Sequence, residues 1–345
     1  MRVLQVMAGA AHGGAETYFV DLVTALSRAG LDQKAVIRSD PDRAAKLRAA
    51  GIEPAELAMG GALDLLSRPR LARVIADYRP DVVQSWMRRA TAFVTRPKGA
   101  PRFAHVGWFG GYYEVAYFRA CDHLIAVTED IRAHQIRSGW PAGQAHTLPT
   151  FADAETAAPV ARAGLGTPEG APLFLALGRL HEKKAFDVLI RAMARLPEAH
   201  LWIAGEGPLR GALEALIAEL DLGPRVRLLG WREDCEALLA AADACVLPSR
   251  YEPFGTVMIE AWAQGTPLIA AAAAGPSALV EDGATGLLVP TDDAEALAAA
   301  MSRLIRDPAL GRRLVEAGRA AFEARFTEEA VVGQYLDFYR SVASP

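Results

Sequence analysis

The sequence DACVLPSRYEPFGTVMIEAWAQGTPLIA, residues 243–270, holds the pattern that decides the fold. Residues 244–247 are an apolar run rich in strand formers, and Pro248 ends it. Apolar residues recur at helical spacing over residues 256–264, and glycine and proline end that segment. The stretch therefore predicts a buried strand, a loop, a helix and a second strand at residues 268–271.

Two glutamates of this stretch fall in different structural positions. Glu252 lies in the expected loop and Glu260 in the expected helix, so about two helical turns separate them if the helix begins near Gly255. The free N–H groups of the helix start, near Gly255 and Thr256, favour an anion. Together these groups indicate a sugar joined to phosphate. Glutamates are often only solvated, so the pair alone leaves a purely structural interpretation open.

Residues 250–270 resemble the glutamate-pair motif of retaining nucleotide-sugar glycosyltransferases, in particular family four, whose members have the GT-B fold. The resemblance implies that Glu252 contacts the hydroxyls of the donor sugar and that Glu260 contacts the ribose hydroxyls of the nucleotide. Beside the two glutamates, the matching residues are Pro253, Phe254, Gly255, Ala261, Gly265 and Pro267.

The composition is typical of a globular protein with two domains. With 345 residues, 52% apolar and 23% charged, the chain can bury two ordinary cores. No apolar run approaches the roughly 18 uncharged residues of a membrane-spanning helix, and Met1-Arg2 leads into an expected strand rather than a signal peptide. We therefore expect a cytoplasmic protein, and peripheral attachment to the inner face of the cytoplasmic membrane stays open.

The sequence contains no recognisable metal-binding pattern. The cysteines at 121, 235 and 245 form no CxxC pair and lie in apolar surroundings, so they read as reduced core thiols. The seven histidines lack metal-ligand spacing. The only Asp-x-Asp sequence, residues 40–42, reads as a turn. We therefore expect no metal and no cofactor.

Positive charge gathers in the first half of the chain. Residues 1–150 hold 19 Lys and Arg against 14 Asp and Glu, although the whole chain has a net charge of −4. Between residues 68 and 102 only Asp77 and Asp81 oppose Arg68, Arg70, Arg73, Arg79, Arg88, Arg89, Arg96, Lys98 and Arg102. This basic region could attract an anionic membrane or an acidic acceptor, and a solvated arginine-rich helix explains it equally well. Nucleic acid is disfavoured because no recognition motif accompanies the charge.

The first strand, expected at residues 3–7, is followed by a glycine turn and a helix. Such a turn lets backbone N–H groups approach a phosphate. The dinucleotide fingerprint is absent, which disfavours a dehydrogenase. Gly13, Gly14 and Glu16 resemble the Gly-Gly-x-Glu opening of the same family, where the loop lies against the donor's sugar-phosphate and the acceptor. A helix entry that only needs small residues stays open.

Repeated strand–helix units predict parallel sheets, which bind ligands at the carboxyl ends of their strands. Residues 103–106 predict a strand that places His105 near such an end, where it could donate to a phosphate or a sugar hydroxyl. A packed core histidine is an equally good interpretation. The next residues, 110–123, resemble a subset of the family that builds bacterial surface polysaccharide and lipopolysaccharide core.

Two cations follow the strand expected at residues 173–176. Arg179 comes directly after Gly178, and Lys184 comes just before an amphipathic helix. An Arg fork and a Lys point charge at a helix entry can clamp a diphosphate. The segment resembles the family's Gly-Arg-Leu…Lys motif, whose two cations neutralise the leaving diphosphate. The register favours Lys184, with Lys183 as the fallback.

Two further turns resemble parts of the family's nucleotide site. Gly205 ends the strand expected at residues 200–204 and would lie under the nucleotide. Trp231 ends another expected strand and could stack on the base, although core packing is the commoner fate of a tryptophan.

The Pro-, Ala- and Gly-rich residues 147–172 lack periodicity and predict a linker, with a boundary near 155–170. The expected architecture is α/β of GT-B type, with two Rossmann-like parallel-sheet domains that face a central cleft. Residues 1–160 would bind the acceptor and 170–325 the nucleotide sugar, and a helix within 326–345 would cross back to the first domain.

We interpret the chain as a metal-independent, retaining glycosyltransferase that acts on a glycan or glycolipid acceptor in lipopolysaccharide or other cell-surface glycan synthesis. The departing phosphate would take the acceptor's proton. A nucleotide-sugar epimerase, a phosphorylase and a non-catalytic sugar-nucleotide-binding protein stay open. The expected catalytic residues are Arg179, Lys184, Glu252 and His105. The expected binding residues are Gly13, Gly14, Glu16, Gly178, Gly205, Trp231, Phe254, Gly255, Thr256 and Glu260.

Overall fold

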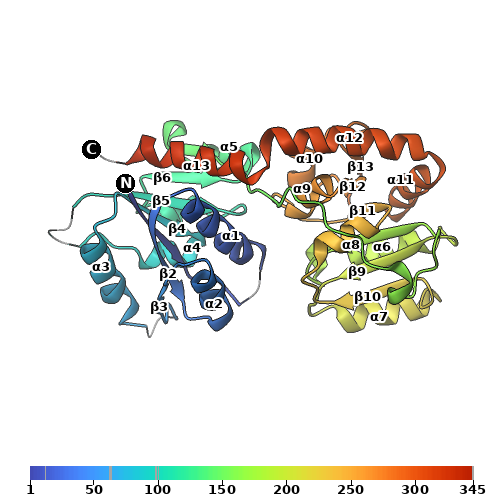
Figure 1. The fold of residues 1–345 in the computed structure, drawn as a ribbon, viewed down its shortest axis with the longest axis horizontal. Coiled ribbons are helices and arrows are strands. Elements are labelled where there is room, and N and C mark those ends of the chain that lie inside the picture. The colour runs from blue at the N-terminus through green and yellow to red at the C-terminus, as the bar shows by residue number, and fades with distance from the viewer. Residues whose placement is uncertain (12, 62–63, 98, 100, 344–345) are drawn as a thin grey trace. The chain divides into compact units, whose positions relative to one another are not determined.

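Figure 1 shows the fold in a computed structural model, which describes residues 1–11, 13–61, 64–97, 99 and 101–343. The chain forms two compact units, and each is described by itself. The first unit comprises residues 1–150 together with 328–345, and the second comprises residues 151–327. Both are built on parallel sheets, as the strand–helix alternation predicts.

The first unit contains a seven-stranded parallel sheet in the order β3-β2-β1-β4-β5-β6-β7. Its strands are β1 (Arg2–Met7), β2 (Asp32–Arg38), β3 (Ala55–Leu57), β4 (Val82–Trp86), β5 (Ala104–Phe109), β6 (His123–Ala126) and β7 (Ala145–Thr147). Its α-helices are α1 (Gly14–Arg28), α2 (Pro41–Ala49), α3 (Ser67–Tyr78), α4 (Met87–Phe93), α5 (Glu129–Arg137) and α13 (Glu328–Val342).

The second unit contains a six-stranded parallel sheet in the order β10-β9-β8-β11-β12-β13. Its strands are β8 (Leu173–Leu177), β9 (His200–Ala204), β10 (Val226–Gly230), β11 (Ala244–Leu247), β12 (Leu268–Ala271) and β13 (Leu287–Val289). Its α-helices are α6 (Phe186–Met193), α7 (Arg210–Glu219), α8 (Cys235–Ala241), α9 (Thr256–Ala263), α10 (Ala274–Leu279), α11 (Ala294–Arg306) and α12 (Pro308–Arg325). The stretch at 243–270 thus forms β11, a loop, α9 and β12, as predicted.

The order of strands reverses at one point in each sheet. In the second sheet the chain runs outward from β8 through β9 to β10, then returns to place β11 on the other side of β8. Parallel sheets bind ligands outside the carboxyl ends of the strands at such a reversal. The loops after β8 and β11 are therefore the expected place for a site in this unit.

The last helix, α13, belongs to the first unit, as predicted. The Tyr339 hydroxyl accepts a hydrogen bond from Gln5 Nε2 at 3.0 Å and donates to Gln84 Oε1 at 2.9 Å. The Tyr335 hydroxyl accepts from Trp108 Nε1 at 3.2 Å. The side chains of all five residues are buried, so these bonds tie α13 to β1, β4 and β5.

The second unit begins at Phe151, before the boundary region expected from composition at 155–170. The linker-like residues are hydrogen-bonded to this unit, because Ala157 N–H donates to Gln264 Oε1 at 2.9 Å. Arg162 also forms a bidentate pair with Asp243, at 2.8 and 3.2 Å. Composition could not reveal these bonds, since their partners lie far along the chain.

Within the residues that the structure describes, no helix combines the length and the apolar character that crossing a membrane requires.

Candidate functional site

The candidate site lies at the carboxyl edge of the second sheet, where glycine backbone closes the ends of three strands. Gly178 N–H donates to Ala204 O at 3.0 Å, and Gly205 N–H donates to Gly230 O at 2.7 Å. A Cβ on Gly205 would lie 1.9 Å from Gly178 O, and Gly205 has a φ of 147°. A side chain at position 205 would clash with this carbonyl and would rarely adopt this φ, so the position requires glycine. We call the closely packed backbone of Gly178 and Gly205 the glycine floor of the site.

Lys184 and Glu252 meet at this edge. Lys184 ends the 3₁₀ turn η4 (Glu182–Lys184) after β8, and Glu252 lies in the loop after β11. Lys184 Nζ donates to Glu252 Oε2 at 2.6 Å, and Ser249 Oγ donates to the same oxygen at 3.3 Å. The side chains are 23% and 10% exposed, so solvent screens this ion pair less than a surface pair. A cation and a carboxylate from separate loops are thus held in contact.

The fallback lysine, Lys183, has a different environment. Lys183 is exposed, and its Nζ lies 4.4 Å from the centre of the Tyr251 ring, which is itself 40% exposed. This is a cation–π contact rather than a contact with Glu252. Of the two lysines, Lys184 is thus the one whose ammonium contacts Glu252, and its role at the diphosphate stays a prediction.

The loop that carries Glu252 has a defined backbone shape. Gly255 precedes α9 with a φ of 87°, in the left-handed region that favours glycine. Gly275 N–H donates to Glu252 O at 2.7 Å, and the Phe254 side chain is buried at 6% exposure. Thr256 is the first residue of α9, so its N–H is among the free donors of the helix start. The loop thus presents a carboxylate next to an electropositive helix end.

Glu260 lies in α9 close to the start of α8. Burial, and after it the charge of Glu260, raises the pKa of the Cys235 thiol to about 12. Trp231 follows β10 just before α8 and is 61% exposed, so the core packing that is common for tryptophan does not apply to it. Glu260 thus lies near Cys235, the first residue of α8, and the exposed Trp231 indole lies in the segment that leads into the same helix.

Arg179 is exposed directly after the carboxyl end of β8. The structure gives its guanidinium no hydrogen bond or ion pair with another residue of the described part of the chain. Its donors are therefore available to an anion, as the clamp interpretation requires.

Arg250 was not singled out by sequence reasoning, yet its guanidinium contacts three other residues at this edge. Its guanidinium forms a bidentate pair with Asp187 at 3.0 and 2.8 Å, and its Nε donates to Asp292 Oδ1 at 2.5 Å. Its Nη1 also donates to Glu182 O at 2.8 Å, and its N–H donates to Lys183 O at 2.9 Å. A lone arginine beside the glutamate motif carried no signal that could reveal these partners.

The glycine loop of the first unit is closed by Glu16. Glu16 Oε1 accepts a hydrogen bond from Ala10 N–H at 2.8 Å. A Cβ on Gly9 or Gly13 would lie 2.6 or 2.3 Å from the Glu16 side chain, whereas one on Gly14 would meet no atom within 4 Å. Gly9 and Gly13 thus make room for a folded-back carboxylate. The open interpretation that the loop only needs small residues has this physical basis.

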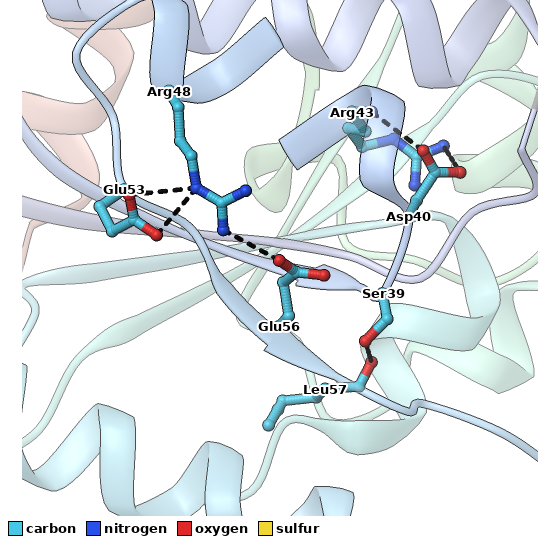
Figure 2. Close-up of polar contacts among 7 residues, drawn as sticks. All are labelled: Ser39, Asp40, Arg43, Arg48, Glu53, Glu56 and Leu57. Atoms are coloured by element: carbon cyan, nitrogen blue, oxygen red, sulfur yellow. Dashed lines mark hydrogen bonds and ion pairs between the residues drawn. The ribbon is translucent and has the colours of Figure 1, made fainter. Parts of the chain in front are cut away.

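Figure 2 shows Arg43 of α2 beside Asp40, and the buried Arg43 side chain also bonds to the glycine loop. Asp40 caps α2 by accepting from Arg43 N–H at 2.9 Å, and Pro41 is the first helical residue. The turn expected at residues 40–42 is therefore a helix start. Arg43 is 4% exposed, pairs with Asp40 at 3.6 Å and donates from Nη2 to Ala10 O at 2.5 Å.

Ion pairs and a hydrogen bond also fix the segment between α2 and β3. Figure 2 shows Arg48 between Glu53 and Glu56, each with an ion-pair distance of 3.0 Å. Ser39 Oγ donates to Leu57 O at 3.4 Å. These contacts join the end of α2, through Arg48, and the residue after β2, Ser39, to β3.

The expectation that His105 lies at the carboxyl end of its strand is wrong. β5 continues to Phe109, so His105 lies near the amino end and is only 2% exposed. Its Nε2 lies 2.9 Å from Ser85 Oγ, and its Nδ1 lies 3.1 Å from Ala120 O. Because a carbonyl only accepts, Nδ1 carries the proton. Burial lowers the pKa of His105 to about 4, so the core interpretation holds.

Among the described residues, no three His, Cys, Asp or Glu side chains gather closely enough to hold a metal ion.

Two family models match the chain. "Glycosyltransferase Family 4" matches residues 12–156, and "Glycosyl transferases group 1" matches residues 159–321. The lipopolysaccharide core biosynthesis glycosyltransferase LpsE of Rhizobium meliloti (strain 1021) is 36% identical over 335 residues, which is 95% of this chain and 96% of LpsE. LpsD of the same strain is 36% identical over 350 residues and covers 99% of each chain.

The fold is also similar to that of a solved structure. HepE from Anabaena, in complex with UDP-glucose, superposes with a TM-score of 0.88 and covers 99% of this chain and 100% of HepE. The identity is 22%, so this likeness supports the fold alone.

We predict that Gly205→Ala separates the carboxyl ends of β8 and β9, because the new Cβ would lie 1.9 Å from Gly178 O. The free energy of unfolding should fall by about 1–3 kcal/mol, measured by urea unfolding. Gly211→Ala in α7 is the matched control, since its Cβ would meet no atom within 4 Å. The control should be neutral or slightly stabilising. Equal stability of the two variants would contradict the packed floor.

Proposed function

Because this chain belongs to the family 4 glycosyltransferases, we propose that it transfers a sugar from a nucleotide diphosphate sugar to an acceptor hydroxyl with retention of anomeric configuration. LpsE and LpsD, which match over nearly the whole chain, are named as glycosyltransferases, so the epimerase alternative gains no support. A pure binding protein would not require the charged groups that follow.

The contact of Lys184 with Glu252, at 2.6 Å beside the strand reversal, is the observation that carries this proposal. As the bond between the sugar and the phosphate breaks, negative charge grows on the diphosphate. Lys184, the exposed Arg179 and the N–H groups at the start of α9 supply positive charge to meet it. Preorganised donors of this kind stabilise the transition state more than the ground state.

The carboxylates and the indole take the other parts of the donor. Glu252 accepts hydrogen bonds from the hydroxyls of the transferred sugar, and its contact with Lys184 keeps it beside the diphosphate. Glu260 accepts two bonds from the ribose diol, and the exposed Trp231 stacks on the base. This assignment rests on the match of the two glutamates to the family motif and on the exposure of the Trp231 side chain.

Retention follows from attack on the face that the diphosphate leaves. The acceptor oxygen bonds to the anomeric carbon as the bond to the phosphate breaks, and a phosphate oxygen takes the acceptor's proton. Glu252 is already bonded by Lys184 and Ser249, which suits a binding carboxylate better than a free nucleophile. His105 takes no part in this proposal because it is buried and both of its ring nitrogens have partners.

The acceptor class that we propose is a lipopolysaccharide core or related cell-surface glycan. The support is the pair of full-length relatives, each at 36% identity, that are named for lipopolysaccharide core biosynthesis.

Lys184→Ala should lower kcat by about 10²–10³, because it removes one preorganised positive donor from the leaving diphosphate. The measurement is nucleotide release with a donor first identified by thermal shift against a panel of nucleotide sugars. Lys183→Ala is the control and should keep a normal rate, because Lys183 contacts the exposed Tyr251 ring. A Lys184→Ala enzyme with normal kcat would refute the clamp.

We propose that turnover needs no metal, because the cations Lys184 and Arg179 are supplied by the chain itself. Dialysis against EDTA should leave kcat and the KM for the donor unchanged in the same assay. A loss of activity that Mg²⁺ or Mn²⁺ restores would overturn this proposal.

Peripheral attachment to an anionic membrane is the proposed role of the basic region. Its described arginines at 68, 70, 73, 79, 88, 89, 96 and 102 are exposed, and Lys98 lies outside the described residues. Leu65 and Leu66 at the edge of this region are 80% and 61% exposed, which adds apolar groups suited to insertion between headgroups. Cytoplasmic placement is part of this proposal.

Arg68 and Arg70, both replaced by Ala, should weaken binding to vesicles rich in phosphatidylglycerol by about 30-fold, at roughly 1 kcal/mol per arginine. Vesicle flotation at low and high salt measures it. The double replacement of Arg191 and Arg195, exposed in the second unit, is the control and should change nothing. Equal binding by both double variants would place the contact elsewhere or nowhere.

A further inference from the structure

We propose that Arg250 is a positioning residue of the donor site, because its guanidinium fixes the loop that carries Lys184 against the loop that carries Glu252. The inference rests on the proposed function, in which Lys184 meets the leaving diphosphate. Arg250 acts through Lys184 and is not itself a catalytic residue.

The contacts of Arg250 join three separate segments. Through Asp187 and the Glu182 carbonyl it holds both ends of the segment that contains Lys184, at distances of 2.8 to 3.0 Å. Through Asp292 it holds the turn between β13 and α11, at 2.5 Å. Its backbone lies two residues before Glu252, and its N–H donates to the Lys183 carbonyl at 2.9 Å. Arg250 thus connects the loop that carries Lys184 to the loop that carries Glu252, and these two loops are called the catalytic loops below.

Two residues of the segments that Arg250 contacts have unfavourable backbone conformations. Ala185, directly after Lys184, has a φ of 52°, and Asp292 has a φ of 60°. Neither is a glycine, so both adopt a left-handed conformation that L-residues rarely take. Such residues persist where their surroundings over-determine them. Arg250 bonds to Asp292 itself, and it bonds to Glu182 and Asp187 on the two sides of Ala185. It therefore supplies part of the constraint that keeps these two residues left-handed.

The ion pair between Arg250 and Asp187 is stronger than an ordinary surface pair. Burial alone would raise the pKa of Asp187, but the hydrogen bonds and charge of Arg250, together with the backbone N–H groups of Asp187 and Val188, outweigh burial and hold that pKa below its ordinary value. The Arg250 side chain is 32% exposed, and its pairing is bidentate. Isolated exposed pairs contribute little, whereas a bidentate arginine in a network is the favourable exception.

Lysine cannot replace this arrangement. The planar guanidinium of Arg250 donates to Asp187, Asp292 and the Glu182 carbonyl in one fixed fork, whereas an ammonium is a point charge on a flexible stem. Arg250→Lys should therefore resemble Arg250→Ala in kcat, although it keeps the charge. This separates positioning from a general effect of positive charge.

The test is a double-mutant cycle between Arg250 and Lys184, with kcat measured at saturating donor and acceptor. Arg250→Ala should lower kcat by about 10–100-fold, because displacing a catalytic group by about 1 Å can cost 10²-fold. In a Lys184→Ala background the same change should cost less than about threefold, because its target is gone. A structural role would lower kcat by the same factor in both backgrounds, and that result would overturn the inference.

Arg162→Ala is the matched control. Arg162 forms a bidentate pair with Asp243 in the same unit, at 2.8 and 3.2 Å, and contacts neither catalytic loop. It should lower Tm without changing kcat.

If Arg250→Ala does not fold, Asp292→Asn takes its place in the cycle, because it weakens one of the contacts of Arg250. Asp292→Asn should lower kcat in the parent and not in the Lys184→Ala background, and equal losses in both would reject the proposal.

The cycle also separates this inference from the proposed function. A normal kcat for Lys184→Ala alone refutes the clamp and removes the premise. A Lys184→Ala variant with the expected loss of about 10²–10³-fold in kcat, in which Arg250→Ala costs the same factor as in the parent, keeps the clamp and rejects only the role of Arg250.

Discussion

The reversal of strand order between β8 and β11 is the constraint on which the site depends. Parallel strands deliver their following loops to one edge, and a reversal leaves an opening between the two loops that depart from it. Lys184 and Glu252 are 68 residues apart in the chain, yet their side chains meet at 2.6 Å because β8 and β11 are neighbours. The glycine floor packs the backbone that follows β8 tightly against the ends of β9 and β10.

Features with local signals were predictable from the sequence. The strand, loop and helix at 243–270 and the parallel sheets follow from spacing and turn residues, whereas the return of the last helix to the first unit was part of the architecture that the resemblance implied. The error at His105 has a specific cause. Gly107 reads as a strand breaker, but β5 continues through it to Phe109. A Cβ on Gly107 would lie 2.7 Å from the Phe118 ring, so this glycine allows close packing rather than a turn.

Long-range partners were not predictable in the same way. Arg250 pairs with Asp187 and Asp292, which lie 63 and 42 residues away, and no local pattern marks such pairs. The same holds for Arg43, whose contact with the Ala10 carbonyl spans 33 residues. Periodicity reports which face of an element is buried, but the choice of partner for a charge depends on how distant loops meet. The resemblance located the groups that would touch substrate, and only the structure revealed what holds them.

The two crossings of the chain between its units have a consequence for modularity. The chain enters the second unit at Phe151 and leaves it after Thr327, and there Ala152 N–H donates to Phe326 O at 3.2 Å while Ala152 and Thr327 form a β-bridge. The segment that enters the second unit and the segment that leaves it are thus hydrogen-bonded to each other. A gene fragment that stops at residue 150 would lack Tyr339 and leave Gln5 and Gln84 without this buried partner. Recombination between relatives therefore has to exchange both ends of the first unit together.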